Sequence, residues 1–295
     1  MNRVKVVGST VILIALIFGA GCSSSPGKPS SAPSLEASQK IKADEITDPV
    51  MQYRLGMHYL FGISVEQNYG KAVKWFTQSA RQGYLSAQNN LGTLYAQGLG
   101  VSRNYREAFK WLDRAARRGS ADAQQNLGLM YASGLGVDRD YHKAFMWFRL
   151  SAAQGHAGAQ AQLGGLYSQG HGVDRDHLKA VKWFRKAARQ GNSYAQYHLA
   201  LSYRDGRGLP ADEVQAYKWF LLSAQNPRED SLEGKKTLSS DIETARQKLE
   251  QKLTADQLEE AQAMARQWKP SPGANSTNTP PRPSHKKRQL KTARS

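Results

Sequence analysis

Apolar residues along this chain recur with two periods at once. Over short stretches they are spaced three and four residues apart, as on one face of an α-helix, and the whole pattern then repeats every 36 residues. Two series mark the repeat: Leu55, Leu91, Leu127, Leu163 and Leu199, and Trp75, Trp111, Trp147, Trp183 and Trp219. Self-similarity at a fixed period of this length is typical of a stacked repeat array. The sequence therefore predicts an all-α protein, an α/α superhelical solenoid of five 36-residue helix-turn-helix repeats.

The first helix of each repeat is expected to pack closely on its neighbour. In the second repeat, Ala87, Leu91 and Leu94 share one face at helical spacing. Gly92 and its equivalents at 56, 128 and 164 lack a side chain, which lets another helix approach. A pair of glycines, Gly98 and Gly100 in this repeat, then ends the helix by adopting backbone angles that other residues avoid.

The second helix of each repeat begins at a side chain suited to capping. These residues are Asn68, Asn104, Asp140, Asp176 and Asp212. The pairs Asn104 with Glu107 and Asp212 with Gln215 also have the spacing of a capping box. A stripe that includes Ala108, Trp111 and Leu112 is expected to be buried, and the tryptophans are read as stacking core rather than a ligand cage.

The repeat pattern bounds the folded region. It begins at Asp48 and Pro49, where an N-cap is followed by proline at the first helical position, and it runs through residues 48–227. Residues 228–269 are predicted to form C-terminal capping helices, at about 241–252 and 255–268. Their starts are placed by two capping-box sequences, Ser240 to Glu243 and Thr254 to Gln257.

The N-terminal sequence resembles a bacterial lipoprotein signal. Residues 1–22 contain Arg3 and Lys5, an apolar run at 11–18, small residues at 19–21 and then Cys22, the one cysteine of the chain. The resemblance implies that Cys22 is lipidated and becomes the first residue of the mature chain, although Gly19 stands where leucine is usual. Ordinary cleavage near Ala20 and an uncleaved anchor helix are the alternatives. Residues 23–47, rich in serine and proline, are read as a flexible tether.

Charge is spread unevenly. The chain of 295 residues carries a net charge of +17, of which +11 falls in residues 51–227 and +6 in residues 270–295. The last segment lacks an apolar face, and we expect it to be a disordered basic tail. In an envelope protein its 282–294 stretch suggests contact with anionic lipid or polysaccharide. Nucleic acid is the expected partner only if the protein is cytosolic.

The repeat consensus resembles the Sel1-like repeats, relatives of the tetratricopeptide repeats. The residues that carry the resemblance in the third repeat are Ala123, Leu127, Gly128, Tyr131, Gly134, Gly136, Val137, Lys143, Ala144, Trp147 and residues 152–155, which read AAQG. Residues 253–268 also resemble the helical tail that often closes such arrays. The resemblance implies an adaptor for other proteins, often in bacterial envelopes.

One branch of that family binds or hydrolyses penicillins. Members of the branch carry a cysteine pair in each repeat, and this chain has none. That absence argues against carrying the penicillin activity over to this chain. A penicillin-binding or β-lactamase-like protein and a linker to an anionic envelope polymer are the alternatives to a protein-binding scaffold.

No catalytic constellation is evident in the sequence, and no cofactor or metal is expected. The paired glycines follow helices instead of strands, so they indicate turns and not phosphate loops. His171, Asp174, Asp176 and His177 offer possible metal ligands, but Asp176 already has a capping role.

Binding is expected on the first helices, on the side opposite Leu91 and its equivalents. In related helical repeats this side lines the concave groove. The predicted groove residues are Tyr53, Met57, Asn89, Thr93, Gln125, Leu129, Ala161, Tyr197, Leu201 and Arg204. They vary between repeats, which fits either a ligand-facing row or unconstrained surface. We thus expect a non-catalytic scaffold of the bacterial cell envelope, anchored through Cys22, facing the periplasm and residing in the outer rather than the inner membrane.

Overall fold

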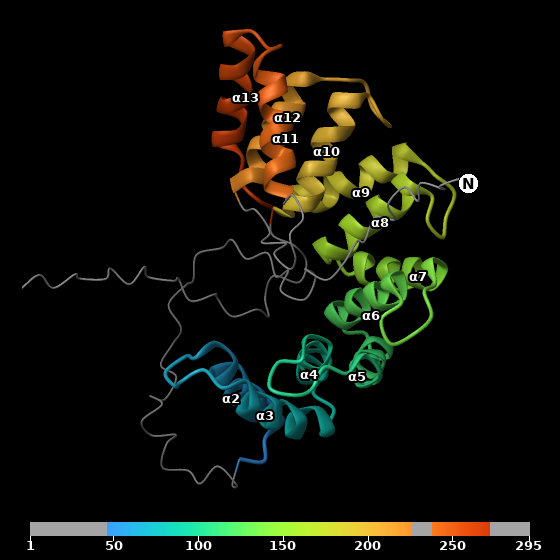
Figure 1. Ribbon diagram of the computed structural model, residues 1–295, viewed down its shortest axis with the longest axis vertical. Helices are drawn as coiled ribbons and strands as arrows, with labels where there is room; N and C mark the ends of the chain where they lie inside the picture. Colours follow the sequence, from blue (N-terminus) through green and yellow to red (C-terminus); the bar gives the residue numbers. More distant parts are fainter. Residues whose placement is uncertain (1–45, 226–237, 272–295) are drawn as a thin grey trace, which may run out of the picture.

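A computed structural model describes residues 46–225 and 238–271, which form twelve α-helices and no strand. Ten of them make the five repeats: α2 (Pro49–Phe61), α3 (Tyr69–Arg81), α4 (Leu85–Gln97), α5 (Tyr105–Arg117), α6 (Ala121–Ser133), α7 (Tyr141–Ala153), α8 (Ala157–Gln169), α9 (His177–Arg189), α10 (Ser193–Asp205) and α11 (Glu213–Gln225). Each first helix packs on the second helix of its own repeat and on that of the repeat before. The array curves as an arc, with α5 and α7 on its outer side (Figure 1). The predicted α/α solenoid is confirmed.

Two further helices cover the C-terminal end: α12 (Leu238–Glu250) and α13 (Ala255–Gln267), both packed on α11. The predicted capping box at Thr254 and Gln257 is present. The one predicted at Ser240 is wrong, because α12 already begins at Leu238 and Ser240 lies within its first turn. Beyond α13 the chain is still held in place, since Ser271 N–H donates to the carbonyl of Arg189 at 2.8 Å. Ser271, which the sequence assigned to the basic tail, is therefore bonded to the end of α9. The rest of the predicted tail lies outside the described residues.

The predicted N-caps of the second helices are confirmed, but the capping boxes expected at Asn104 and Asp212 are not formed. Asn104 Oδ1 accepts from the backbone N–H of Glu107 at 3.1 Å. Its own N–H is already taken, because it donates to the carbonyl of Tyr95 at 2.9 Å. The same bond from N-cap to the preceding first helix occurs in all five repeats, at Tyr59, Tyr95, Tyr131, Tyr167 and Tyr203. It fixes where each second helix starts relative to the first.

In each repeat a large, fully buried side chain follows the tryptophan directly: Phe76, Leu112, Phe148, Phe184 and Phe220. In the first four repeats it packs against the glycine of the first helix. A Cβ atom at Gly128 would lie 2.7 Å from the ring of Phe148. The tryptophans have a different position. Trp111, Trp147 and Trp183 are half-buried, and each packs against the hydrophobic cluster that includes the second helix of the preceding repeat. Phenylalanine therefore joins the helices of one repeat, and tryptophan joins neighbouring repeats.

The second glycine of each turn has a positive φ and touches the preceding repeat. Gly136 has φ 72°, and a Cβ there would lie 2.6 Å from the carbonyl carbon and oxygen of Tyr105, the first residue of α5. The equivalent position in the first repeat is Ser64, which adopts φ 57°. Serine is tolerated there because no repeat precedes the first one.

A row of buried glutamines also runs along the array. The side-chain amides of Gln88, Gln124, Gln160 and Gln196 donate to the carbonyls of Ala80, Ala116, Ala152 and Ala188, at 3.0 to 3.4 Å. At Gln124 and Gln160 a second glutamine, thirty residues later, donates to the glutamine oxygen, as Gln154 does to Gln124 at 2.7 Å. Gln88 is the exception. Its Oε1 is buried without a hydrogen-bond partner, because the residue thirty positions on is Arg118, which donates to the carbonyl of Gly83 instead.

The turn geometry predicts opposite outcomes for two substitutions at equivalent positions. Gly136→Ala should lower the free energy of unfolding by about 3 kcal/mol, since it combines a left-handed backbone with a backbone clash. Ser64 has no preceding repeat to touch, so Ser64→Gly only relieves the backbone strain. It should change the free energy of unfolding by about 1 kcal/mol or less. Urea unfolding followed by circular dichroism measures both. Equal effects of the two substitutions would show that the contact with the preceding repeat is unimportant.

The glutamine row predicts a stabilising substitution. Arg118→Gln places an amide donor next to Gln88 Oε1, as in the other repeats, and should raise the free energy of unfolding by about 1 kcal/mol. Arg117→Gln is the matched control, because it removes the same charge from the neighbouring exposed position. That control should be neutral or slightly destabilising, since it breaks the ion pair with Asp113. Equal melting temperatures for the two variants would contradict the assignment of Gln88 Oε1 as an unpaired acceptor that residue 118 can satisfy.

Candidate partner-binding surface

The predicted groove residues lie on the first helices α2, α4, α6, α8 and α10, but they are not equally accessible. Thr93, Gln125, Leu129 and Ala161 are buried, with 8% or less of their surface exposed. The expectation that they face a partner is wrong for the array as it stands. Tyr53, Met57, Asn89, Tyr197 and Leu201 are half-buried and Arg204 is exposed, so their partner-binding role stays a prediction.

The burial has a simple cause in the packing of successive first helices. Leu129, on α6, belongs to a cluster that includes Leu163 and Leu166 of α8. Ala161, on α8, belongs to the cluster built around α9 and α10. A side chain that points away from its own second helix therefore meets the next repeat before it meets solvent. The helical wheel of a single repeat does not contain this neighbour.

Polar side chains link α2, α4 and α6 on this side, and we call Asn89, Asn90 and Asn126 the asparagine strip. Asn126 Nδ2 donates to Asn89 Oδ1 at 2.9 Å, and Asn90 Nδ2 contacts Met57 Sδ at 3.3 Å. Asn126 Oδ1 is buried without a hydrogen-bond partner within the described residues. An unpaired buried oxygen costs about 1–3 kcal/mol. Asn126 is only 7% exposed, so the members of the strip that a partner can reach are Asn89 and Asn90, which are half-buried. Of the strip, only Asn89 was singled out from the sequence.

Aromatic residues flank the accessible surface at both ends of the array. Tyr53 packs on Phe76 and Tyr84, with ring centroids 5.7 and 5.0 Å apart. Burial raises the pKa of its hydroxyl to about 12. At the other end Tyr197 packs on His198 and Phe220, and burial lowers the pKa of His198 to about 4. Both groups are therefore uncharged near neutral pH.

Charge separates the two layers of the array. Asp122 is the only Asp, Glu, Lys or Arg in α4, α6 and α8. On α10, Arg204 is paired with Asp205 at 2.6 Å, and this hydrogen bond lowers the pKa of the Asp205 carboxyl. The second helices, by contrast, carry most of the lysines and arginines. The first helices thus offer a nearly neutral surface of aromatic, amide and aliphatic side chains.

The remaining sequence predictions fall into two groups. Asp176 caps α9, accepting from the N–H of Lys179 at 2.8 Å, and His171 stacks on Tyr141 with centroids 4.6 Å apart. Asp176 and His171, two of the candidate metal ligands, thus have other contacts within the array. Cys22 and the basic stretch 282–294 lie outside the described residues. Within the described parts of the chain, no helix is long and apolar enough to cross a membrane.

Comparison with known proteins matches the array to one family. The Sel1 repeat model matches residues 49–84, 85–120, 121–156, 157–192 and 193–227. No curated protein resembles the chain closely enough to count as a match.

Solved structures also resemble the chain. A Sel1 repeat protein from Oxalobacter formigenes is 30% identical, with a TM-score of 0.61 over 73% of this chain and 93% of that one. A protective antigen present in uropathogenic Escherichia coli strains is 25% identical, with a TM-score of 0.38 over 77% and 69%. A Sel1 repeat protein from Klebsiella pneumoniae is 21% identical, with a TM-score of 0.45 over 72% and 97%. The matched repeats cover more than half of the sequence at the same 36-residue period that the helices follow, and the chain belongs to the Sel1 repeat family.

Proposed function

We propose that this protein is a non-catalytic protein-interaction scaffold of the bacterial cell envelope, and that its partner binds across the first helices of the first three repeats. The observation that carries the proposal is the asparagine strip beside the half-buried Tyr53 and Met57. Tyrosine and methionine are enriched at protein interfaces, and charged residues are depleted at the core of such interfaces.

The shape of the surface supports an extended occupant. The strip lies on α4 and α6 and contacts Met57 of α2, so a segment lying along the strip and Met57 contacts three repeats in turn. The side-chain amides of the half-buried Asn89 and Asn90 can exchange hydrogen bonds with the backbone of such a segment. Arg204 and Leu201 at the far end, on α10, are too distant in the repeat order to form part of the same short site, and we assign them no role in it.

We further propose that the scaffold is held at the membrane by lipid on Cys22. The support is the order of basic, apolar and small residues before the cysteine. A single acyl chain gives only marginal membrane affinity, whereas several acyl chains hold a protein stably.

The groove assignment is tested by site-specific crosslinking in the producing bacterium. A photoreactive phenylalanine at position 53 of the full chain should give a discrete crosslinked band. Asn89→Asp places a charge in the neutral strip, and should reduce that band at least about tenfold, as loss of a well-placed interface contact does. Gln78→Glu, on α3, adds the same charge outside the strip and should leave the band unchanged. If both variants crosslink like the parent chain, the partner does not use this surface.

The anchor is tested separately by metabolic labelling with an alkynyl fatty acid. The chain should incorporate the label, and Cys22→Ala should abolish incorporation. Retention of unlabelled, full-length Cys22→Ala in the membrane fraction would favour an uncleaved apolar anchor at residues 11–18. An unlabelled parent chain contradicts the lipoprotein assignment without affecting the groove.

A further inference from the structure

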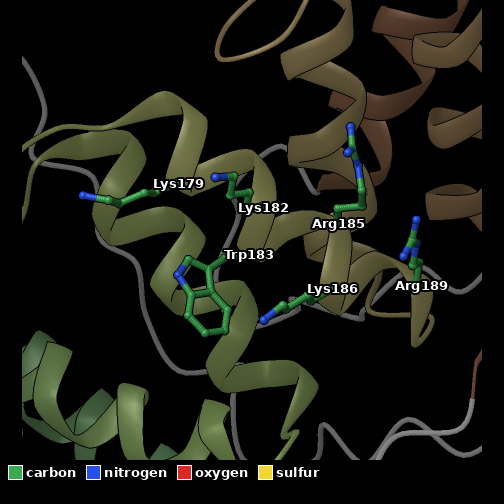
Figure 2. Close-up of a pocket in the computed structure, with 6 residues that line it drawn as sticks. All are labelled: Lys179, Lys182, Trp183, Arg185, Lys186 and Arg189. Atoms are coloured by element: carbon green, nitrogen blue, oxygen red, sulfur yellow. The ribbon is translucent and has the colours of Figure 1, made fainter.

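The outer layer of the array carries an unusual concentration of cations on one helix. Residues 177–189 of α9 include Lys179, Lys182, Arg185, Lys186 and Arg189 and no aspartate or glutamate. These five side chains and Trp183 line an open hollow of about 410 Å³ (Figure 2). The equivalent helix α5 has nearly as many cations, but Glu107 and Asp113 offset part of their charge.

Most of this charge is not neutralised by the protein. Within the described parts of the chain, Lys179 is the one cation of α9 with a carboxylate within 4 Å, the capping Asp176. Arg185 donates to the hydroxyl of Tyr203, and the Lys186 ammonium lies 4.6 Å from the centre of the Trp183 ring. Both contacts orient the cations without removing their charge. Like charges along one helix repel each other, so an anionic ligand would relieve this repulsion.

Exposed apolar side chains lie next to these cations. Leu178 on α9 is 55% exposed, and Met146 and Leu150 on α7 are 48% and 44% exposed. Met146 and Leu150 occupy the positions of Lys182 and Lys186 one repeat earlier, 36 residues apart. Trp183 packs against the cluster that contains Phe148 of α7, so α9 and α7 belong to adjacent repeats joined by this contact. We call Met146, Leu150, Leu178, Lys182, Lys186 and Arg189 the α7–α9 face.

The described chain ends beside the same helix. The N–H of Ser271 donates to the carbonyl of Arg189, the last residue of α9. The sequence beyond Ser271 carries six further lysines and arginines, at 282, 286, 287, 288, 291 and 294.

We propose that the α7–α9 face binds the surface of an anionic lipid bilayer. Cations alone would suit any polyanion, but exposed leucine and methionine between them suit a surface whose hydrocarbon lies just below charged headgroups. The curvature of the array agrees, because α7 lies on the outer side of the arc, where a broad flat surface can reach it (Figure 1). The nearly neutral first helices stay free for a protein partner.

Vesicle binding by the full chain carrying Cys22→Ser tests the proposal. The probes are vesicles of phosphatidylcholine alone and vesicles with about one third phosphatidylglycerol, enough to create a negative surface potential. The apolar leader and the basic tail are present in every variant. The quantity compared is therefore the affinity of each variant for anionic vesicles, divided by that of the parent chain. Each cation near such a surface contributes roughly a factor of five. Lys182→Glu/Arg189→Glu should therefore weaken binding by at least about tenfold.

Two further variants identify what the face recognises. Lys74→Glu/Arg81→Glu makes the same charge change at the equivalent positions of α3, and should weaken binding less than about threefold, through net charge alone. Met146→Gln/Leu150→Gln should weaken vesicle binding severalfold, yet leave binding of soluble polyphosphate unchanged. All four residues of the charge variants and both apolar residues are exposed, so circular dichroism should show a folded chain in every case.

Two results would overturn the proposal. The first is equal loss of binding for the α9 and α3 charge variants, which would mean that net charge and not this face attracts the bilayer. The second is a combination of two findings. Met146→Gln/Leu150→Gln binds vesicles like the parent chain, and Lys182→Glu/Arg189→Glu loses binding to vesicles and to polyphosphate alike. That outcome would identify the face as a general polyanion site.

Discussion

The fold depends on the contact between one repeat and the backbone of the next. At Gly136 the turn lies directly on the first residue of α5, with no room for a side chain. The same contact recurs at Gly100, Gly172 and Gly208, and it is absent where serine replaces glycine in the first repeat. Backbone-to-backbone contact leaves little freedom of distance or angle. It therefore sets how each repeat is placed on its predecessor, and through this the curvature of the arc.

The buried polar rows follow from that placement. Since each repeat meets the next in the same geometry, a glutamine at one position reaches the same carbonyl every 36 residues. Buried amides of this kind are costly unless paired, so the row favours one register of stacking over others. Gln88 shows the cost of an interruption, because Arg118 leaves its oxygen unpaired.

The same stacking creates two surfaces of different chemistry. First helices face one another across the repeats, and they carry almost no charge between Leu85 and Gln169. Second helices turn lysines and arginines outward, with the highest density on α9. A protein that must hold a partner and stay close to an anionic surface would need such a division, since a basic inner face would compete for the same anions.

The sequence by itself determined the repeat, its helix boundaries near Asp48 and Asn104, and the end of the periodic region, because each follows from local spacing and capping within one repeat. It did not locate the accessible surface. Thr93, Gln125, Leu129 and Ala161 look exposed on a single helix and are buried in the array. The spacing of the glutamines was visible in the sequence, but their partners were not. Contacts between repeats depend on the angle at which helices stack, and only the tertiary structure sets that angle, since it arises from backbone contacts made thirty or more residues apart.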